Sequence, residues 1–153
     1  MTSNVSSIQL AILDIGGIRI SFPRNDIAGI CLTTDMQTEL PANNREVAWV
    51  ENENYQWPVF SISKDFTILP RSSDKHRFCV CLDRKQDKTF GLTCDAVEAF
   101  ELKDNSAALT LPDCMSNPIS PILHVFMHNQ GLIFMSNANA MRDFLLTLET
   151  VYG

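Results

Sequence analysis

The sequence lacks any cluster of basic residues. It has 12 Lys and Arg residues against 18 Asp and Glu residues, a formal net charge of −6, and its basic residues never gather beyond short pairs such as Arg84-Lys85. A nucleic-acid-binding surface needs a stripe of basic residues, and an acidic chain is repelled by phosphates and by anionic lipid heads. We therefore expect no nucleic-acid partner and no direct membrane contact.

Signals for membrane insertion and export are also missing. No stretch approaches the roughly 18 consecutive apolar residues of a membrane span, and residues 1–7 carry no Lys or Arg ahead of an apolar run, as a secretory signal would. The five cysteines form neither a CxxC pair nor the framework of a small secreted domain. These absences predict a cytoplasmic protein with reduced cysteines.

Motifs for metal binding and catalysis are absent as well. His124 and His128 stand four apart, as zinc ligands of a helix do, but their segment has a strand pattern, in which such positions lie roughly 13 Å from each other. Cys79 and Cys81 share one side of a predicted strand and are typical of small buried hydrophobes. No Gly-x-Ser-x-Gly elbow or phosphate-binding glycine loop occurs. We expect no enzyme activity, no metal and no cofactor.

What the sequence does contain is an average globular composition and many short β-type segments. Apolar residues make up 45% and charged residues 20% of the 153 residues, which fits one compact domain at residues 1–153. A loop at residues 70–77 is the expected boundary between two subdomains. Alternating apolar and polar residues, and turn residues such as Gly16-Gly17, predict strands. The expected strands are residues 8–15, 18–22, 45–50, 57–62, 78–82, 89–94, 97–102, 108–111, 122–127 and 132–135.

Two segments are predicted to be helical. Residues 25–30 resemble one short turn, because two isoleucines stand three apart behind a capping Asn or Asp. Ala138–Tyr152 carries apolar residues at spacings of three and four, which predicts an amphipathic helix, capped by Asn137 or by Asn139. Many strands with a single terminal helix predict an all-β fold of barrels or a sandwich.

One polar segment favours a binding role. Residues 51–57 read Glu-Asn-Glu-Asn-Tyr-Gln-Trp, which places Tyr55 and Trp57 in an acidic turn. Tyr and Trp are enriched at binding hot spots. Inward packing of Trp57 as a strand residue, covered by Tyr55, fits the pattern equally well. Trp49 is expected in the core.

Three segments carry a family pattern. Residues 10–23 form the first expected hairpin and end in Phe22-Pro23, Pro58-Val59 lies in a central strand, and residues 90–97 read Phe-Gly-Leu-Thr-Cys-Asp-Ala-Val, a Gly-Leu-x-x-Asp-x-Val segment. In this order, and with matches along nearly the whole chain, they resemble the CheW-like domain of bacterial chemosensory systems. The chain resembles a divergent member of that family, which includes the chemotaxis coupling protein.

The resemblance implies two small five-stranded SH3-like barrels packed against each other, all-β apart from the C-terminal helix. It implies a non-enzymatic adaptor, or scaffold, of a chemosensory or two-component signalling pathway. One barrel of such an adaptor pairs with the regulatory domain of a histidine kinase. A groove between the barrels holds the helical tip of a chemoreceptor, and no cofactor is needed.

This chain departs from the family at charged positions. When the chain is aligned on Pro58, the family's Arg falls at Glu53 and its Gly at Asn54, while an acidic residue of many members falls at Gly29. Replacing a cation with an anion at an interface costs several kcal/mol when the partner presents an acid. We therefore expect an altered partner surface, formed by Gly29, Glu53, Asn54, Tyr55 and Trp57.

Two other functions stay open. One is a small-ligand sensor on the same scaffold, with a pocket lined by Tyr55, Trp57 and Phe60. The other is a cysteine-dependent enzyme. A strong response of the melting temperature to metabolites would favour the sensor, because a ligand that binds the folded state stabilises it.

Overall fold

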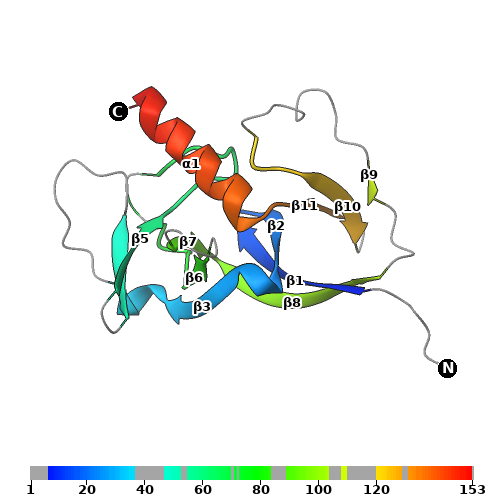
Figure 1. The fold of residues 1–153 in the computed structure, drawn as a ribbon, viewed down its shortest axis with the longest axis horizontal. Helices are drawn as coiled ribbons and strands as arrows, with labels where there is room; N and C mark the ends of the chain where they lie inside the picture. The colour runs from blue at the N-terminus through cyan, green and yellow to red at the C-terminus, as the bar shows by residue number, and fades with distance from the viewer. Residues whose placement is uncertain are drawn as a thin grey trace.

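The protein is mostly β with one C-terminal helix, as predicted (Figure 1). The computed structural model describes residues 7–36, 47–52, 55–69, 71, 73–83, 89–103, 108–109, 120–128 and 131–152. The elements are β1 (Ser7–Ile15), β2 (Ile18–Pro23), η1 (Arg24–Asp26), β3 (Ile27–Leu32), η2 (Thr33–Asp35), β4 (Ala48–Asn52), β5 (Tyr55–Phe60), β6 (Phe78–Leu82), β7 (Phe90–Cys94), β8 (Ala96–Lys103), β9 (Ala108–Leu109), β10 (His124–His128), β11 (Gly131–Met135) and α1 (Ala138–Tyr152).

The strands form two sheets. One has the order β8-β1-β2-β11-β10-β9, in which the sixth strand is the two-residue β9, and the other has the order β3-β6-β7-β5-β4. The chain enters the five-stranded sheet after η1 and leaves it at Asp95, between β7 and β8. Strands β5 and β6, which precede and follow residues 70–77 in the chain, belong to the same sheet.

The predicted hairpins are confirmed. β1 and β2 are antiparallel and are joined by Gly16 and Gly17, whose φ angles of 60° and 97° favour glycine. β6 pairs with β7 and β10 pairs with β11 in the same antiparallel way. Pro58 lies inside β5, where it faces Trp49 of β4, but pairing with β7 begins only at the next residue, so no ladder hydrogen bond to β7 is lost there.

The buried apolar residues form three clusters, because alternate residues of a strand face opposite sides of a sheet. The largest lies between the sheets and contains Leu13, Phe22, Phe60 and Phe90. Each sheet also has a smaller cluster on its other face. This arrangement matches two small packed units, although the ladders of the described part leave both sheets open at their end strands.

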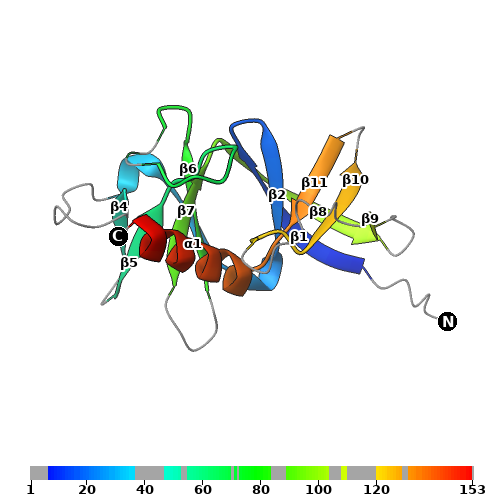
Figure 2. The same cartoon turned by 90° about the horizontal axis from the view of Figure 1, so that it is seen from above.

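Helix α1 covers the large cluster and has the predicted bounds. It runs across β5 and β7 toward β2 (Figure 2), and its Met141 and Leu145 side chains are fully buried. The Ala140 amide donates to Asn137 Oδ1 at 2.7 Å, which confirms Asn137 as a cap. The Ala138 amide donates to Asp26 Oδ2 at 2.9 Å, so the helix start is tied to the crossover between the sheets.

Candidate partner-binding site

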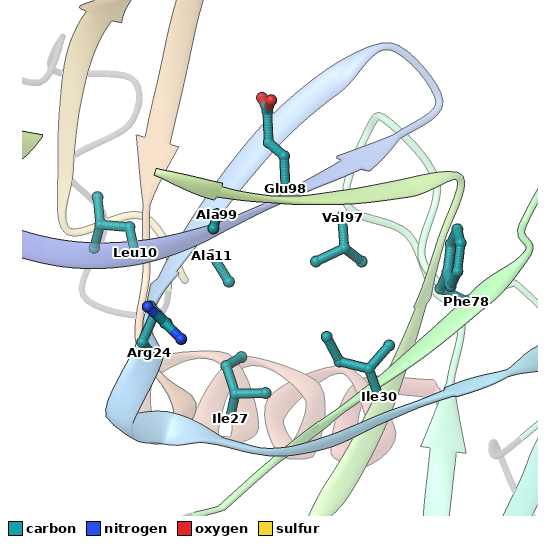
Figure 3. Close-up of a pocket in the computed structure, with 9 residues that line it drawn as sticks. All are labelled: Leu10, Ala11, Arg24, Ile27, Ile30, Phe78, Val97, Glu98 and Ala99. Carbon is teal, nitrogen blue, oxygen red and sulfur yellow. The ribbon is translucent and has the colours of Figure 1, made fainter. Parts of the chain in front are cut away.

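A cleft of about 450 Å³ lies between the two sheets, where β3 faces β1 and β8. In Figure 3, Ile27 and Ile30 on β3 point across it toward Ala11 on β1 and Val97 on β8. The cleft is therefore built by segments from both sheets. The residues that line it are Leu10, Ala11, Arg24, Ile27, Ile30, Phe78, Val97, Glu98 and Ala99.

The walls of the cleft are apolar, and the wall formed by β3 is exposed to solvent. Ile30 is 51% exposed, and Leu32, two residues further along the same side of β3, is 48% exposed. The opposite wall carries small side chains, Ala11 and Ala99, which let a partner approach the strands closely. A contiguous exposed apolar surface with a polar border is typical of an interaction site.

Two charged residues border the cleft. Arg24 lies at one end, where its Nη1 donates to Gln9 Oε1 at 2.9 Å. The Glu98 carboxylate is directed away from the cleft in Figure 3. Of the lining residues these two alone carry a charge, and none is a Ser, Thr, Cys or His. The walls therefore supply shape and apolar contact but no nucleophile.

A bulge in β3 explains why sequence analysis missed this wall. The prediction of a helical turn over residues 25–30 is wrong after Asp26, because η1 ends there and β3 begins at Ile27. On a regular strand, residues three apart face opposite sides. Here the pairing shifts between Ile27 and Gly29, and the extra residue of the bulge returns Ile30 to the side of Ile27. Two isoleucines three residues apart can therefore face the same side without forming a helix.

The predicted partner residues are only partly brought together. Gly29 lies on β3, and a Cβ atom built there meets nothing within 4 Å, so the position has room for a larger side chain. Tyr55 begins β5, which is separated from β3 by the two strands β6 and β7 in the sheet order. Glu53 and Asn54 lie outside the described residues.

Trp57 packs inward instead of standing free in a turn. It faces Val50 of β4 and lies, half-buried, on the cluster that includes Val59 and Cys79. Phe60 is fully buried in the large cluster on the other side of the sheet. Because the two residues are three apart on one strand, they cannot line a common pocket, and the sensor pocket expected from them is wrong. Trp49 is half-buried and not part of the buried core.

A buried polar chain is the second site that the sequence did not reveal. His76 Nδ1 lies 2.7 Å from Thr93 Oγ1, which in turn hydrogen-bonds Ser61 Oγ. His76 Nε2 lies 3.4 Å from Asp95 Oδ1. If Nε2 carries the proton toward Asp95, Nδ1 accepts from Thr93, and Thr93 accepts from Ser61. No local sequence spacing predicts this row of hydrogen-bonded side chains, because its members come from separate parts of the structure.

This arrangement has the connectivity of a hydroxyl-imidazole-carboxylate triad, but its hydroxyls are closed to substrate. Ser61 and Thr93 are fully buried, and His76 is 6% exposed. The chain joins β7 to the loop before β6 and to the residue after β5, next to Asp95, where the polypeptide changes sheets. We infer that it fastens the crossover.

Burial makes the stability of this site depend on pH. Desolvation lowers the pKa of His76 below its usual 6.5, and the nearby Asp95 carboxylate opposes the shift only in part. Below pH 6.5 the unfolded chain therefore takes up the proton before the folded one does. The part of the free energy of unfolding that depends on neutral His76 is fully present above pH 6.5. It decreases as the pH drops from 6.5 toward the lowered pKa of His76.

We expect the free energy of unfolding of the wild type, measured by urea titration at a series of pH values, to decrease through this range. In His76→Gln this part of the decrease should be absent, since glutamine does not titrate. Equal slopes in the two proteins would contradict the assignment to His76.

Metal and membrane sites find no support in the described part of the chain. It contains no group of three His, Cys, Asp or Glu side chains that could hold a metal ion. His124 and His128 lie at the two ends of strand β10, as their pattern predicted. None of the described helices is long and apolar enough to cross a membrane.

The fold has a known counterpart. The crystal structure of scaffolding protein TtCheW from Thermoanaerobacter tengcongensis superposes with a TM-score of 0.67 over 86% of this chain and 89% of that one, at 16% sequence identity. No protein-family model and no curated protein sequence matches the chain. The CheW-like fold expected from the sequence is therefore confirmed by structure, at a sequence identity that shows the fold alone.

Proposed function

We propose that this protein is a non-enzymatic adaptor of a chemosensory or two-component pathway, which holds partner proteins in place. The observation that carries the proposal is the open apolar cleft between the two sheets, lined by Ile27, Ile30 and Val97 and without a nucleophile on its walls. The structural likeness to a scaffolding protein supports it.

A helix with an apolar face fits this cleft best. Amphipathic helices bind by laying apolar side chains into a hydrophobic groove, and Ala11 and Ala99 leave space for them opposite the isoleucines. Leu32 extends the apolar strip along β3 beyond the cleft. The helical tip of a chemoreceptor, which the family resemblance implies as a partner, has this chemistry.

The proposed kinase contact lies elsewhere on the five-stranded sheet and is altered. It would involve Gly29 on β3 and the β4–β5 hairpin with Glu53, Asn54, Tyr55 and Trp57. The family's charged pair is absent at Gly29 and Glu53, so a kinase regulatory domain that relies on it should bind weakly. Among these residues, Trp57 would contribute to this contact indirectly. Its ring is half-buried and supports the hairpin.

The variant Ile30→Glu tests the cleft. A carboxylate placed against an apolar helix loses its water without gaining a partner, so we expect affinity for the purified helical tip of a chemoreceptor from the same genome to fall roughly 10- to 100-fold, the loss typical of a central contact. Isothermal titration calorimetry measures it. Ile30 is exposed in the free protein, so the variant should fold normally.

Leu132→Glu is the matched control, because Leu132 is 46% exposed on β11, outside the cleft. Unchanged affinity in Ile30→Glu, or an equal loss in the control, would contradict the cleft as the binding site. A kinase regulatory domain and receptor captured as strongly as by an ordinary coupling protein would sink the altered-surface part of the proposal.

A small-ligand sensor is the second candidate. The cleft volume of about 450 Å³ lies within the range of small-molecule sites, roughly 300 to 1,000 Å³. Large melting-temperature shifts with metabolites, lost in Ile30→Glu, would favour it over the adaptor.

A further inference from the structure

Three cysteines meet on the face of the five-stranded sheet that is turned away from the large core. Cys31 of β3 stands directly opposite Cys79 of β6 in an antiparallel ladder. Cys81 lies two residues further along β6, on the same side. All three thiols are free, and all three pack in the smaller apolar cluster of this sheet.

The register of the strands suits a disulfide between Cys31 and Cys79. Residues directly opposite each other in an antiparallel pair have Cα atoms roughly 4.5 to 5.5 Å apart, and disulfides need about 4.4 to 6.8 Å. The Cys31 and Cys79 side chains therefore lie on the same face of the sheet, directly across the ladder from each other.

Burial differs sharply between the two partners. Cys79 is fully buried, whereas Cys31 is partly exposed on the edge strand of the sheet. Gly91 lies on the neighbouring strand β7, opposite Cys81, and a Cβ atom at that position would lie 2.6 Å from the Cys79 sulfur. The glycine of the Gly-Leu segment thus makes room for this thiol, and an oxidant from solution reaches Cys31 first.

We propose that Cys31 is a site of reversible oxidation by peroxides and that Cys79 captures the oxidised sulfur as a disulfide between β3 and β6. The Cys31 sulfur attacks a peroxide oxygen; the O–O bond breaks, an S–O bond forms, and hydrogen peroxide loses one oxygen to give sulfenic acid and water. The Cys79 sulfur then attacks the Cys31 sulfur. An S–S bond forms, the S–O bond breaks, and the hydroxide leaves as water with the Cys79 proton.

The electron balance of this sequence is complete. Two thiols lose two electrons and two hydrogens in total, and one hydrogen peroxide is reduced to two waters. A thiol reductant reverses the step by exchange. Because burial and nearby negative groups raise the pKa of the Cys31 thiol, the thiolate is scarce at neutral pH, and the oxidation rate should increase as the pH rises.

Oxidation would act on the cleft, a consequence that rests on the proposed function, whereas the disulfide itself does not. Among the described strands, β3 is an edge strand that pairs only with β6, and it carries Ile27 and Ile30. A covalent bond to β6 fixes the position of that wall. Partner affinity measured on reduced and oxidised protein tests this consequence separately from disulfide formation.

The test is peptide mapping of the full chain after treatment with hydrogen peroxide and alkylation of the remaining thiols, without reduction. Trypsin yields residues 25–45 with Cys31, residues 78–84 with Cys79 and Cys81, and separate peptides for Cys94 and Cys114. We expect a linked pair of the first two peptides. Fragmentation at Val80 should place the bond on Cys79, and dithiothreitol should remove it.

Three variants sharpen the result. In Cys31→Ser and in Cys79→Ser the linked species should fall roughly tenfold or more, since one sulfur is gone. Cys94→Ser is the matched control, because Cys94 is buried in the large cluster on the other side of the sheet, and the disulfide should remain. If a serine variant fails to fold, the mapping of the wild type still decides.

Four outcomes would overturn the proposal. They are no linked peptide, a bond from Cys31 to Cys81, a bond that involves Cys114 or a second molecule, and oxidation of Cys31 that stops at the sulfinic or sulfonic acid. Each would show that Cys79 does not resolve the oxidised Cys31.

Discussion

Replacing Leu145 with alanine is expected to lower the free energy of unfolding by about 3 kcal/mol, within the range seen when a fully buried leucine leaves a cavity. Leu145 is 0% exposed and packs, with Met141, on the cluster between the sheets. At the start of the same helix, the Ala138 amide donates a hydrogen bond to Asp26, in η1, where the chain passes from one sheet to the other. Helix α1 therefore closes the core that both sheets share.

Leu146→Ala supplies the matched control, because Leu146 lies next in the chain but is 39% exposed. Its change should stay within roughly 1 kcal/mol. Urea titration followed by circular dichroism measures both variants. If Leu145→Ala keeps the stability of the wild type, then α1 does not close the core, and its apolar stripe must be read instead as a surface that docks a partner.

Features set by local pattern could be predicted from the sequence. The apolar spacing of three and four residues across Ala138–Tyr152 predicts helix α1, because one face of the helix is buried against the core. Gly16-Gly17 placed the first hairpin because both residues adopt positive φ. Cys79 and Cys81 were correctly assigned to one side of a strand, since strand alternation needs no tertiary information.

Features set by distant pairing could not be predicted in the same way. The bulge after Ile27 depends on the register between β3 and β6, which are far apart in the sequence. It turned an isoleucine spacing that favours a helix into one wall of the cleft. The half-burial of Trp57 depends likewise on the cluster beneath it, so the sequence pattern fits exposure and inward packing equally well and does not decide between them.

The candidate site was likewise predictable only in part. The resemblance implied a groove between two small units, and the structure has a cleft at their junction. None of its lining residues is among the five partner residues expected from the sequence, although Gly29 is the chain neighbour of Ile30. A family pattern records positions of contact with partners, whereas the wall of a cleft is fixed only when two sheets pack.

Thr93→Val should have the second large effect, a loss of roughly 2 to 4 kcal/mol in the free energy of unfolding, because it leaves two buried groups without a partner at about 1 to 3 kcal/mol each. Valine keeps the shape of threonine but removes the hydroxyl that bonds His76 Nδ1 and Ser61 Oγ. Both groups are closed to water, since Ser61 is 0% and His76 6% exposed, so no solvent replaces the lost hydrogen bonds.

Thr67→Val is the control of equal shape change, because among the hydrogen bonds of the described residues the Thr67 hydroxyl bonds only the exposed hydroxyl of Ser63. Valine keeps the hydrogen bonds that the Thr67 backbone makes to Ser63. Its cost should remain near 0.5 kcal/mol, as for most surface substitutions. Equal effects of the two variants in urea titrations would show that the buried chain does not fasten the crossover. A large loss in Thr93→Val that is reduced when Ser61→Ala is added would place part of the cost on the stranded Ser61 hydroxyl, since removing both partners costs less than leaving one unpaired.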